Sequence, residues 1–362
     1  MMSNQPYAQE VQGVIIIAIW VLLALSSIVL TILIFRKELG LRRKSIFEQR
    51  AKVLERALLI HISGSLKELK QTFIVHSSDV DVLLKILPKI LWLLKDTGKN
   101  SISDFIDTLG LKSIIRNNVT SIRLKTRLGA IEMLGYLPAE RQHLEMLHTI
   151  IRKDHNPTVV YRAAKSLSQL HSPESLPIII EHFHKLEFLS IPYLVNILSG
   201  FGARAYLPLR RIINSVDSSI NLKVAVIRVF GSGGGLNVEN YDLILSQCSN
   251  ANEKIVIEAY RSLSTSNQII TNDIIKTGSM HPLWEVRLHT ADCARHCQKI
   301  PIHQLNELIT DEKWLVGLHA ARAIMSFGQP GKRILEVISR KTTLAATRAS
   351  SVLNEFEVMS DG

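Results

Sequence analysis

Cysteine and histidine side chains lie close together near residue 293, where they could bind a metal ion. Cys293 and Cys297 are four residues apart, which on a helix places both thiols on one face. His289 precedes Cys297 by eight residues, about 12 Å along a helix axis, so these three side chains cannot share one zinc ion. Free cysteine is also common in protein cores. We interpret both cysteines as core residues and expect no metal site.

A glycine-rich stretch, Gly231–Gly235, is the second pattern that could do chemistry. A phosphate-binding loop of the P-loop type would continue into Lys-Ser or Lys-Thr, and this stretch does not. Leu236 occupies the place of the third glycine of a dinucleotide-binding loop. The stretch follows an apolar segment that ends at Phe230, so we interpret it as a flexible turn between helices.

The remaining histidines form no catalytic pattern. The chain has 13 of them, including His143/His148 and His182/His184, without an ordered nucleophile or carboxylate partner. We therefore expect no catalytic residues, no cofactor, no small-molecule substrate and no enzymatic activity.

The elements around these residues begin with an apolar segment. Residues 13–35 form an uncharged run of 23 residues, which as a helix is about 35 Å long and could cross a membrane. Residues 1–12 carry no Lys or Arg, unlike the start of a signal peptide. The sequence predicts a retained single-pass transmembrane helix that follows a short non-cytoplasmic tail, residues 1–12.

Basic residues follow this segment directly. Residues 36–56 contain eight basic and three acidic side chains, a net charge of +5 out of +11 for the whole chain. Positive charge marks the cytoplasmic side, so we expect the N-terminus outside the cytoplasmic membrane and the rest in the cytoplasm. The residues predicted to set this topology and to lie at the membrane surface are Arg36, Lys37, Arg42, Arg43 and Lys44.

From about residue 121 the sequence repeats with a period near 31 residues. A small residue recurs four positions before an aliphatic one, a spacing that places both on one helical face. The pairs are Ala130/Leu134, Ala163/Leu167, Leu194/Leu198, Ala225/Val229, Ala259/Leu263, Thr290/Ala294, Ala320/Ile324 and Ala349/Leu353. Further apolar stretches lie between them, so each period holds two helices. Regular repetition of this length predicts a solenoid, with irregular repeats near 185 and 280, where Leu194 and Thr290/Ala294 depart from the pattern.

The repeat unit resembles the HEAT family, in particular its short bacterial form related to phycobilisome-lyase repeats. The residues that carry the resemblance are Asp154, Pro157, Val159, Ala163 and Leu167, and then Asp311, Trp314, Val316, Ala320, Ile324 and Gly328. It implies an all-α fold with an α-solenoid of about eight HEAT-like hairpins over residues 121–358. Residues 36–120, with an apolar helix from 80 to 95 interrupted at Pro88, are predicted to form a basic juxtamembrane stalk and helical cap.

These elements favour a non-catalytic, membrane-tethered scaffold that binds a membrane-associated protein partner. One alternative, implied by the resemblance, is a lyase or chaperone acting on a cofactor-bearing protein. The other is nucleic-acid binding, which would require a row of basic residues at one repeat position. The position two residues after the small one is mixed, so we expect no nucleic-acid partner. It reads Glu132, Lys165, Asn196, Ile227, Arg261, Asp292, Arg322 and Ser351.

Two tryptophans are the candidate partner-binding residues. Trp284 and Trp314 are 30 residues apart, and each lies two residues before the valine that opens its helix. They therefore occupy equivalent places in adjacent repeats and should line one edge of the solenoid. Tryptophan is enriched at binding hot spots, although the same pair could instead fill the junctions between repeats.

Overall fold

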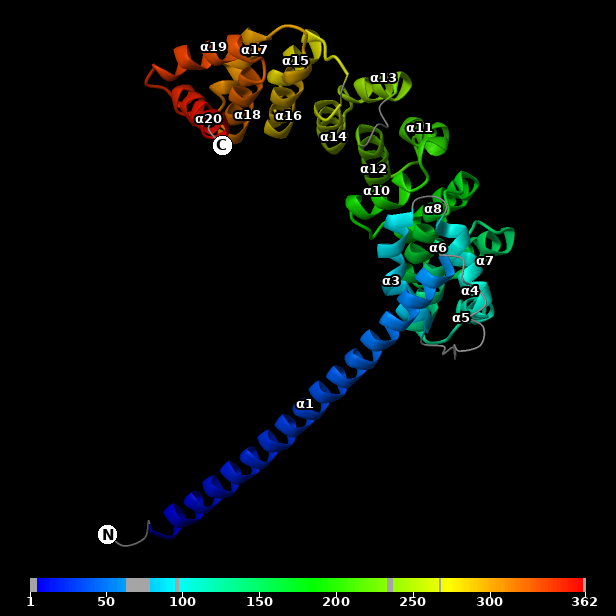
Figure 1. Cartoon of the computed structure of the whole chain (residues 1–362). Helices are drawn as coiled ribbons and strands as arrows, with labels where there is room; N and C mark the ends of the chain where they lie inside the picture. Colours follow the sequence, from blue (N-terminus) through cyan, green and yellow to red (C-terminus); the bar gives the residue numbers. More distant parts are fainter. Residues whose placement is uncertain (1–4, 63–78, 95–97, 233–236, 267, 361–362) are drawn as a thin grey trace. The chain divides into compact units, whose positions relative to one another are not determined.

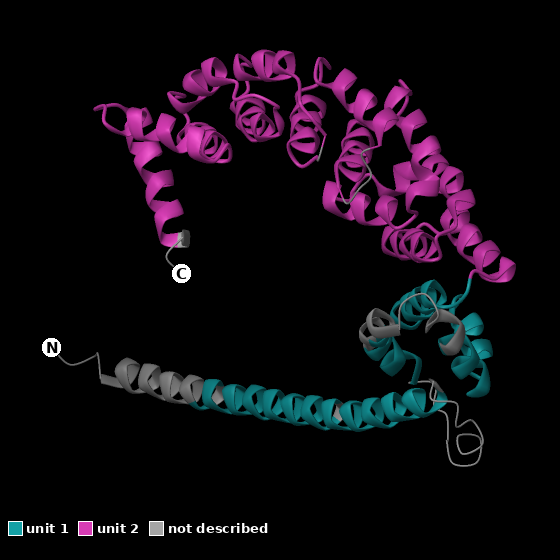
Figure 2. Ribbon diagram, turned by 45° about the horizontal axis from the view of Figure 1, so that its top comes forward, with its two compact units in different colours: residues 1–138 teal, residues 139–362 magenta. Residues whose placement is uncertain are grey.

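The computed structural model describes residues 5–62, 79–94, 98–232, 237–266 and 268–360. Every regular element in these ranges is a helix, with no strand among them, as the sequence predicts (Figure 1). The chain divides into two compact units, residues 1–138 and 139–362, called unit 1 and unit 2 here (Figure 2).

Unit 1 begins with a long helix, α1 (Gln5–Ile62). Its last turns pack against α3 (Asp79–Leu94) and α4 (Gly98–Thr108), and Leu54 and Leu58 are fully buried there. The helix α3 continues through Pro88, so the predicted interruption at that residue is wrong. The unit is completed by α5 (Leu111–Asn118) and α6 (Leu124–Tyr136), which pack against each other.

The structure does not support the predicted transmembrane helix. Among the described residues, no helix is both long and apolar enough to cross a membrane. Side chains of residues 13–19 and of Val21 lie outside that description. The described large apolar side chains from Trp20 to Phe35 are 51–68% exposed, with Arg36 and Lys37 next along the same helix.

Unit 2 consists of helix pairs that form two layers. The odd layer contains α7 (Arg141–Lys153), α9 (Leu176–Glu181), α11 (Tyr206–Asn214), α13 (Val238–Gln247), α15 (Asn272–Ser279), α17 (Ile302–Ile309) and α19 (Gln329–Ser339). The even layer contains α8 (Pro157–Gln169), α10 (Ile191–Ser199), α12 (Ile220–Gly231), α14 (Glu253–Ser264), α16 (Trp284–Cys293), α18 (Trp314–Met325) and α20 (Leu344–Ser360). Each even helix packs on the next even helix (Figure 1). This is the stacking that defines a solenoid.

The repeated small and aliphatic residues form the core of this stack. Ala163 and Leu167 on α8 are fully buried, and so are Ala320 and Ile324 on α18. A small side chain lets the neighbouring helix approach, and the aliphatic side chain one turn later fills the space beside it. The sequence period therefore corresponds to real packing contacts, and the prediction of a repeat solenoid is confirmed.

Two repeats are irregular, at the places where the sequence pattern weakens. The helix α9 has only six residues and is followed by a short 3-10 helix, Phe183–Leu186. The helix α16 ends at Cys293 and continues as a 3-10 turn, Ala294–His296. A 3-10 turn at a helix end satisfies some of its free carbonyl groups within a few residues.

Candidate interaction surface

The turns that precede α8, α14, α16 and α18 share one polar contact. In each of these four turns a side chain accepts a hydrogen bond from the backbone N–H two residues later, as in an Asx turn. The acceptors are Asp154 (2.8 Å to the nitrogen of Asn156), Asn250 (2.9 Å to that of Asn252), His281 (3.2 Å to that of Leu283) and Asp311 (2.8 Å to that of Lys313). Because burial lowers the pKa of His281, its ring stays neutral and can accept through Nδ1. These turns set the direction in which each of these four helices begins.

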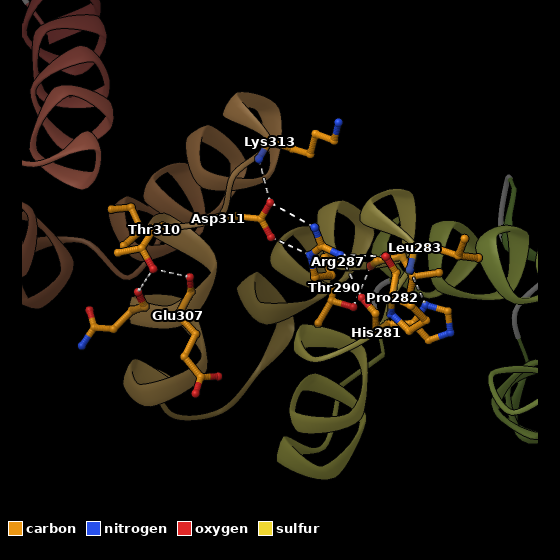
Figure 3. Close-up of polar contacts among 12 residues, drawn as sticks. His281, Pro282, Leu283, Arg287, Thr290, Glu307, Thr310, Asp311 and Lys313 are labelled. Atoms are coloured by element: carbon orange, nitrogen blue, oxygen red, sulfur yellow. Dashed lines mark hydrogen bonds and ion pairs between the residues drawn. The ribbon is translucent and has the colours of Figure 1, made fainter.

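Arg287 on α16 joins two of these turns (Figure 3). It donates from Nε and Nη2 to the two carboxylate oxygens of Asp311, at 2.6 and 3.2 Å, and from Nη1 to the carbonyl oxygens of His281 and Pro282. Desolvation raises the pKa of Asp311, but hydrogen bonds from Arg287 and Lys313 outweigh it, so the pKa lies below its usual value. The pair is largely buried and fixes the α16 repeat against the α18 repeat.

Two other cations bind the carbonyl groups at the ends of odd helices. Lys185 Nζ donates to the carbonyl oxygens of Ile151 and Arg152, at 2.9 and 2.8 Å, one repeat earlier. Arg348 donates to those of Ile309 and Asp311, at 2.5 and 2.7 Å. A cation there complements the partial negative charge at a helix C-terminus. Both contacts connect consecutive repeats.

The two candidate tryptophans occupy equivalent places, since Trp284 is the first residue of α16 and Trp314 is the first of α18. Their surroundings differ. Trp284 is half-buried, whereas Trp314 is 44% exposed with the guanidinium carbon of Arg348 5.4 Å from its ring centroid. Trp314 therefore covers a buried cation of the next repeat and still offers part of its ring to solvent. Their role in partner binding stays a prediction.

Charged residues of both signs alternate along the even layer. Arg228 pairs with Glu258 (Nε to Oε1, 2.7 Å), His319 pairs with Asp292 (2.9 Å), and Arg322 pairs with Glu355 (3.0 Å). Each of these pairs spans two neighbouring even helices. Each of these basic groups is paired with a carboxylate, so they do not form the uninterrupted row of cations that binds phosphates.

The cysteines and histidines near residue 293 are placed in the core or against backbone carbonyls. Cys293 is fully buried, and its Sγ lies 3.5 Å from the carbonyl oxygen of Tyr260. Burial raises the pKa of its thiol, which keeps it protonated. Burial also lowers the pKa of His289 to about 4, and His296 Nε2 lies 3.1 Å from the carbonyl oxygen of Ser264. No group of three metal-binding side chains occurs among the described residues.

The glycine-rich stretch is only partly visible, because residues 233–236 lie outside the described ranges. Gly231 is the last residue of α12, and a Cβ there would collide with Ser262 of α14. The Ser262 hydroxyl donates to the carbonyl oxygen of Ile227. Gly231 therefore permits close approach of two even helices.

The predicted membrane-surface residues lie on α1 beyond its exposed apolar part. Arg36 and Lys37 are exposed, Arg42 pairs with Glu38 at 2.7 Å, and Lys44 lies 3.8 Å from Glu48. The side chain of Arg43 lies outside the described set. Exposed pairs four residues apart contribute little to helix stability, so these cations remain available to solvent.

Sequence reasoning missed the polar contacts between repeats. Asp154 and Asp311 were identified as part of the repeat pattern, but the contacts they make were not predicted. Asn250 and His281 also lie nine positions before the small core residue of their repeat, so alignment on that residue could have identified them. No such signal marks Lys185 or Arg348, which occupy different positions of the repeat.

Two layers of stacked helix pairs define an all-helical repeat solenoid. Residues 123–186 match the sequence family described as HEAT repeats. No curated protein matches the chain. Two crystal structures of engineered proteins are similar. The first is 14% identical to this chain, with a TM-score of 0.35, and the match covers 86% of this chain and 98% of the engineered one. The second is 15% identical, with a TM-score of 0.17, and the match covers 67% of this chain and 95% of the engineered one. Likenesses this distant carry no argument about function.

Proposed function

We propose that this protein is a membrane-tethered scaffold that binds a protein partner through its repeat array. HEAT-like solenoids generally serve protein–protein interaction, and stacked repeats offer a long surface for it. The observation that carries the tether is the composition of α1. One continuous helix has exposed apolar side chains from Trp20 to Phe35 and fully buried ones at Leu54 and Leu58. It would therefore join a membrane segment to the packed helices without a linker.

The proposed orientation places the array in the cytoplasm. The uncharged run of residues 13–35 is followed by Arg36 and Lys37, whereas residues 1–12 carry no basic side chain. A tether also raises the effective concentration of the array near other membrane proteins, so modest contacts would suffice. The partner in this proposal is a membrane-associated protein.

The proposal includes no catalytic role. The nucleophilic thiols near residue 293 are buried and protonated, and His289 stays neutral because burial lowers its pKa. Acidic groups interrupt the basic ones along the even layer, so a protein partner fits this surface better than a nucleic acid does.

The tether is tested by extracting membranes with alkaline carbonate. We expect the full-length chain to stay in the membrane pellet, and the double variant Leu25→Arg, Val29→Arg to be released. Each arginine near the centre of a span costs about 2.5–3.5 kcal/mol. The matched control is Leu59→Arg, which changes an exposed leucine of α1 outside the apolar segment. Release of the wild-type chain by carbonate would disprove the tether.

Partner binding is tested by co-purification from detergent-solubilised membranes. We expect Trp314→Ala to reduce recovery of the partner at least about fivefold, because exposed aromatic rings are frequent hot spots. The melting temperature should fall only slightly, since the ring is 44% exposed and its contact with Arg348 contributes about 0.5–2 kcal/mol. Leu207→Ala, at an exposed leucine on α11, is the control. Equal recovery with both variants would exclude Trp314 from the interface.

A further inference from the structure

An apolar groove lies on the odd layer between α17 and α19. It has a volume of about 610 Å³, within the range of peptide and ligand sites. Its apolar lining includes Ile302, Ile309, Ile334, Val337 and Ile338. Of these, Val337 is 60% exposed and Ile302 is 39% exposed. The groove therefore presents aliphatic surface to solvent.

The groove exists because α19 packs away from α17. The helix α19 makes its main contacts with α18 and α20, whereas α17 packs on α15 and α18. Gly331, in the first turn of α19, approaches α18 so closely that a Cβ would collide with the carbonyl oxygen of Ile324. This close approach fixes the start of α19 on α18 and leaves the α17 side of the groove open.

The groove also carries positive charge. Arg333 and Lys341 line it, both are exposed, and its lining contains no carboxylate. An apolar floor with cations at the rim selects an apolar segment that carries acidic residues.

The end of α20 has this composition. In the last two turns of α20, Phe356 is 48% exposed and Val358 is 77% exposed. Glu355 and Glu357 alternate with them along the helix, and both are exposed, although Glu355 also pairs with Arg322 of α18 at 3.0 Å. We call residues 353–358 the α20 tail. Its apolar and acidic residues complement the groove in both polarity and sign of charge.

The α20 tail cannot reach the groove of its own chain. Thr343 and Ala345, at the start of α20, line the groove, and Val358 is 13 residues further on. A helix rises 1.5 Å per residue, so the tail lies about 20 Å away along a rigid axis. Only another molecule can bring an α20 tail to this place.

We propose that a second copy of this chain occupies the groove, with each copy inserting its α20 tail beside Val337 of the other. The start of α20 lines the groove, and the end of α20 is the tail. Two antiparallel α20 helices related by a two-fold axis would therefore place each tail in the groove of the other copy. Such an exchange closes as a dimer and cannot continue into a filament. This inference goes beyond the proposed scaffold function and does not depend on it.

Cross-linking between differently tagged full-length copies in detergent tests the proposal. One copy carries Val337→Cys and the other carries Val358→Cys, and mild oxidation should join them into a product that contains both tags. Background should be low, because native Cys248, Cys293 and Cys297 are all buried and burial raises the pKa of each thiol. The control pairs Val358→Cys with Leu207→Cys, an exposed site on α11. No product, or equal product with the control, overturns the proposal.

The oligomeric state supplies an independent measurement. Light scattering of the detergent-solubilised chain should give a dimer, and Val337→Glu should raise the dimer dissociation constant by about tenfold or more, because a carboxylate then enters an apolar contact. Val216→Glu, at a side chain that is 92% exposed, should leave it unchanged. A wild-type monomer at tens of micromolar, or a Val337→Glu dimer as tight as that of the control, contradicts the proposal.

Discussion

At the scale of single residues, charged side chains act mainly as connectors between repeats. Arg287, Lys185 and Arg348 each bind groups in a neighbouring turn or helix end, and each is at least partly buried. A buried cation is tolerated only where carbonyl or carboxylate oxygens replace the water it loses. Here those oxygens come from the helix ends and turns that every repeat contains.

The Arg287–Asp311 pair gives a prediction with a defined pH dependence. Asp311→Asn should lower the free energy of unfolding by about 3–5 kcal/mol, because it leaves the largely buried Arg287 guanidinium without its directly paired carboxylate. The pKa of Asp311 is lower in the folded state than in the unfolded chain, so its contribution is complete above pH ~4. It is lost as the pH falls through the folded-state pKa.

Urea unfolding at pH 7 and at pH 3 measures this effect. The difference between wild type and Asp311→Asn should be largest at pH 7 and smaller at pH 3. A difference that stays constant over that range would show that ionisation of Asp311 does not stabilise the fold. The control is Asp217→Asn, at an exposed aspartate in the turn before α12.

At the scale of elements, the sequence predicted the even helices well and the contacts between them poorly. Ala163/Leu167 and Ala320/Ile324 were recognised because core residues must recur with the helical period. The burial of Arg348 could not be predicted in this way. It depends on space left by Gly317, where a Cβ would collide with the guanidinium, and on carbonyl oxygens 37 and 39 residues earlier.

Of the candidate sites, too, the sequence predicted one and gave no sign of the other. The equivalence of Trp284 and Trp314 followed from their spacing of 30 residues. Each is the first residue of its helix, which begins two residues earlier than the valine that was expected to open it. The groove between α17 and α19 had no sequence signal, because it results from the direction in which α19 leaves α18. A periodic pattern identifies which residues face inward, but it does not give the angle between successive helices.

Gly331 offers a test at this scale. Gly331→Ala should destabilise the protein by about 1–3 kcal/mol despite the higher helix propensity of alanine, because the new methyl group must displace backbone of α18. Gly40→Ala, in α1 with nothing within 4 Å of the new Cβ, should be neutral or slightly stabilising. Thermal unfolding followed by circular dichroism measures both. If the two variants melt alike, α19 does not depend on this close approach.

At the scale of the whole molecule, buried thiols report whether the repeat array is intact. Burial raises the pKa of Cys248 to about 12, and Cys293 is fully buried in the following repeat. Since the thiolate is the reactive form, both should react with a disulfide reagent at pH 8 at least about a hundredfold more slowly than in denaturant. Mass spectrometry of the modified chain would assign each rate. Rapid modification of Cys293 in the native protein would mean that α16 opens locally.

The stacking of unit 2 also has a mechanical consequence. Each even helix packs on the next, and polar connectors such as Arg228–Glu258 and Arg322–Glu355 reach only one repeat further along the chain. A pulling force on the C-terminus, with the other end held, would load these joints in series, so the weakest joint would yield first. Force spectroscopy should then record several small unfolding steps in place of one large rupture, with lengths near that of one repeat. An array built in this way would stretch under tension and re-form when the tension is released, as an elastic element does.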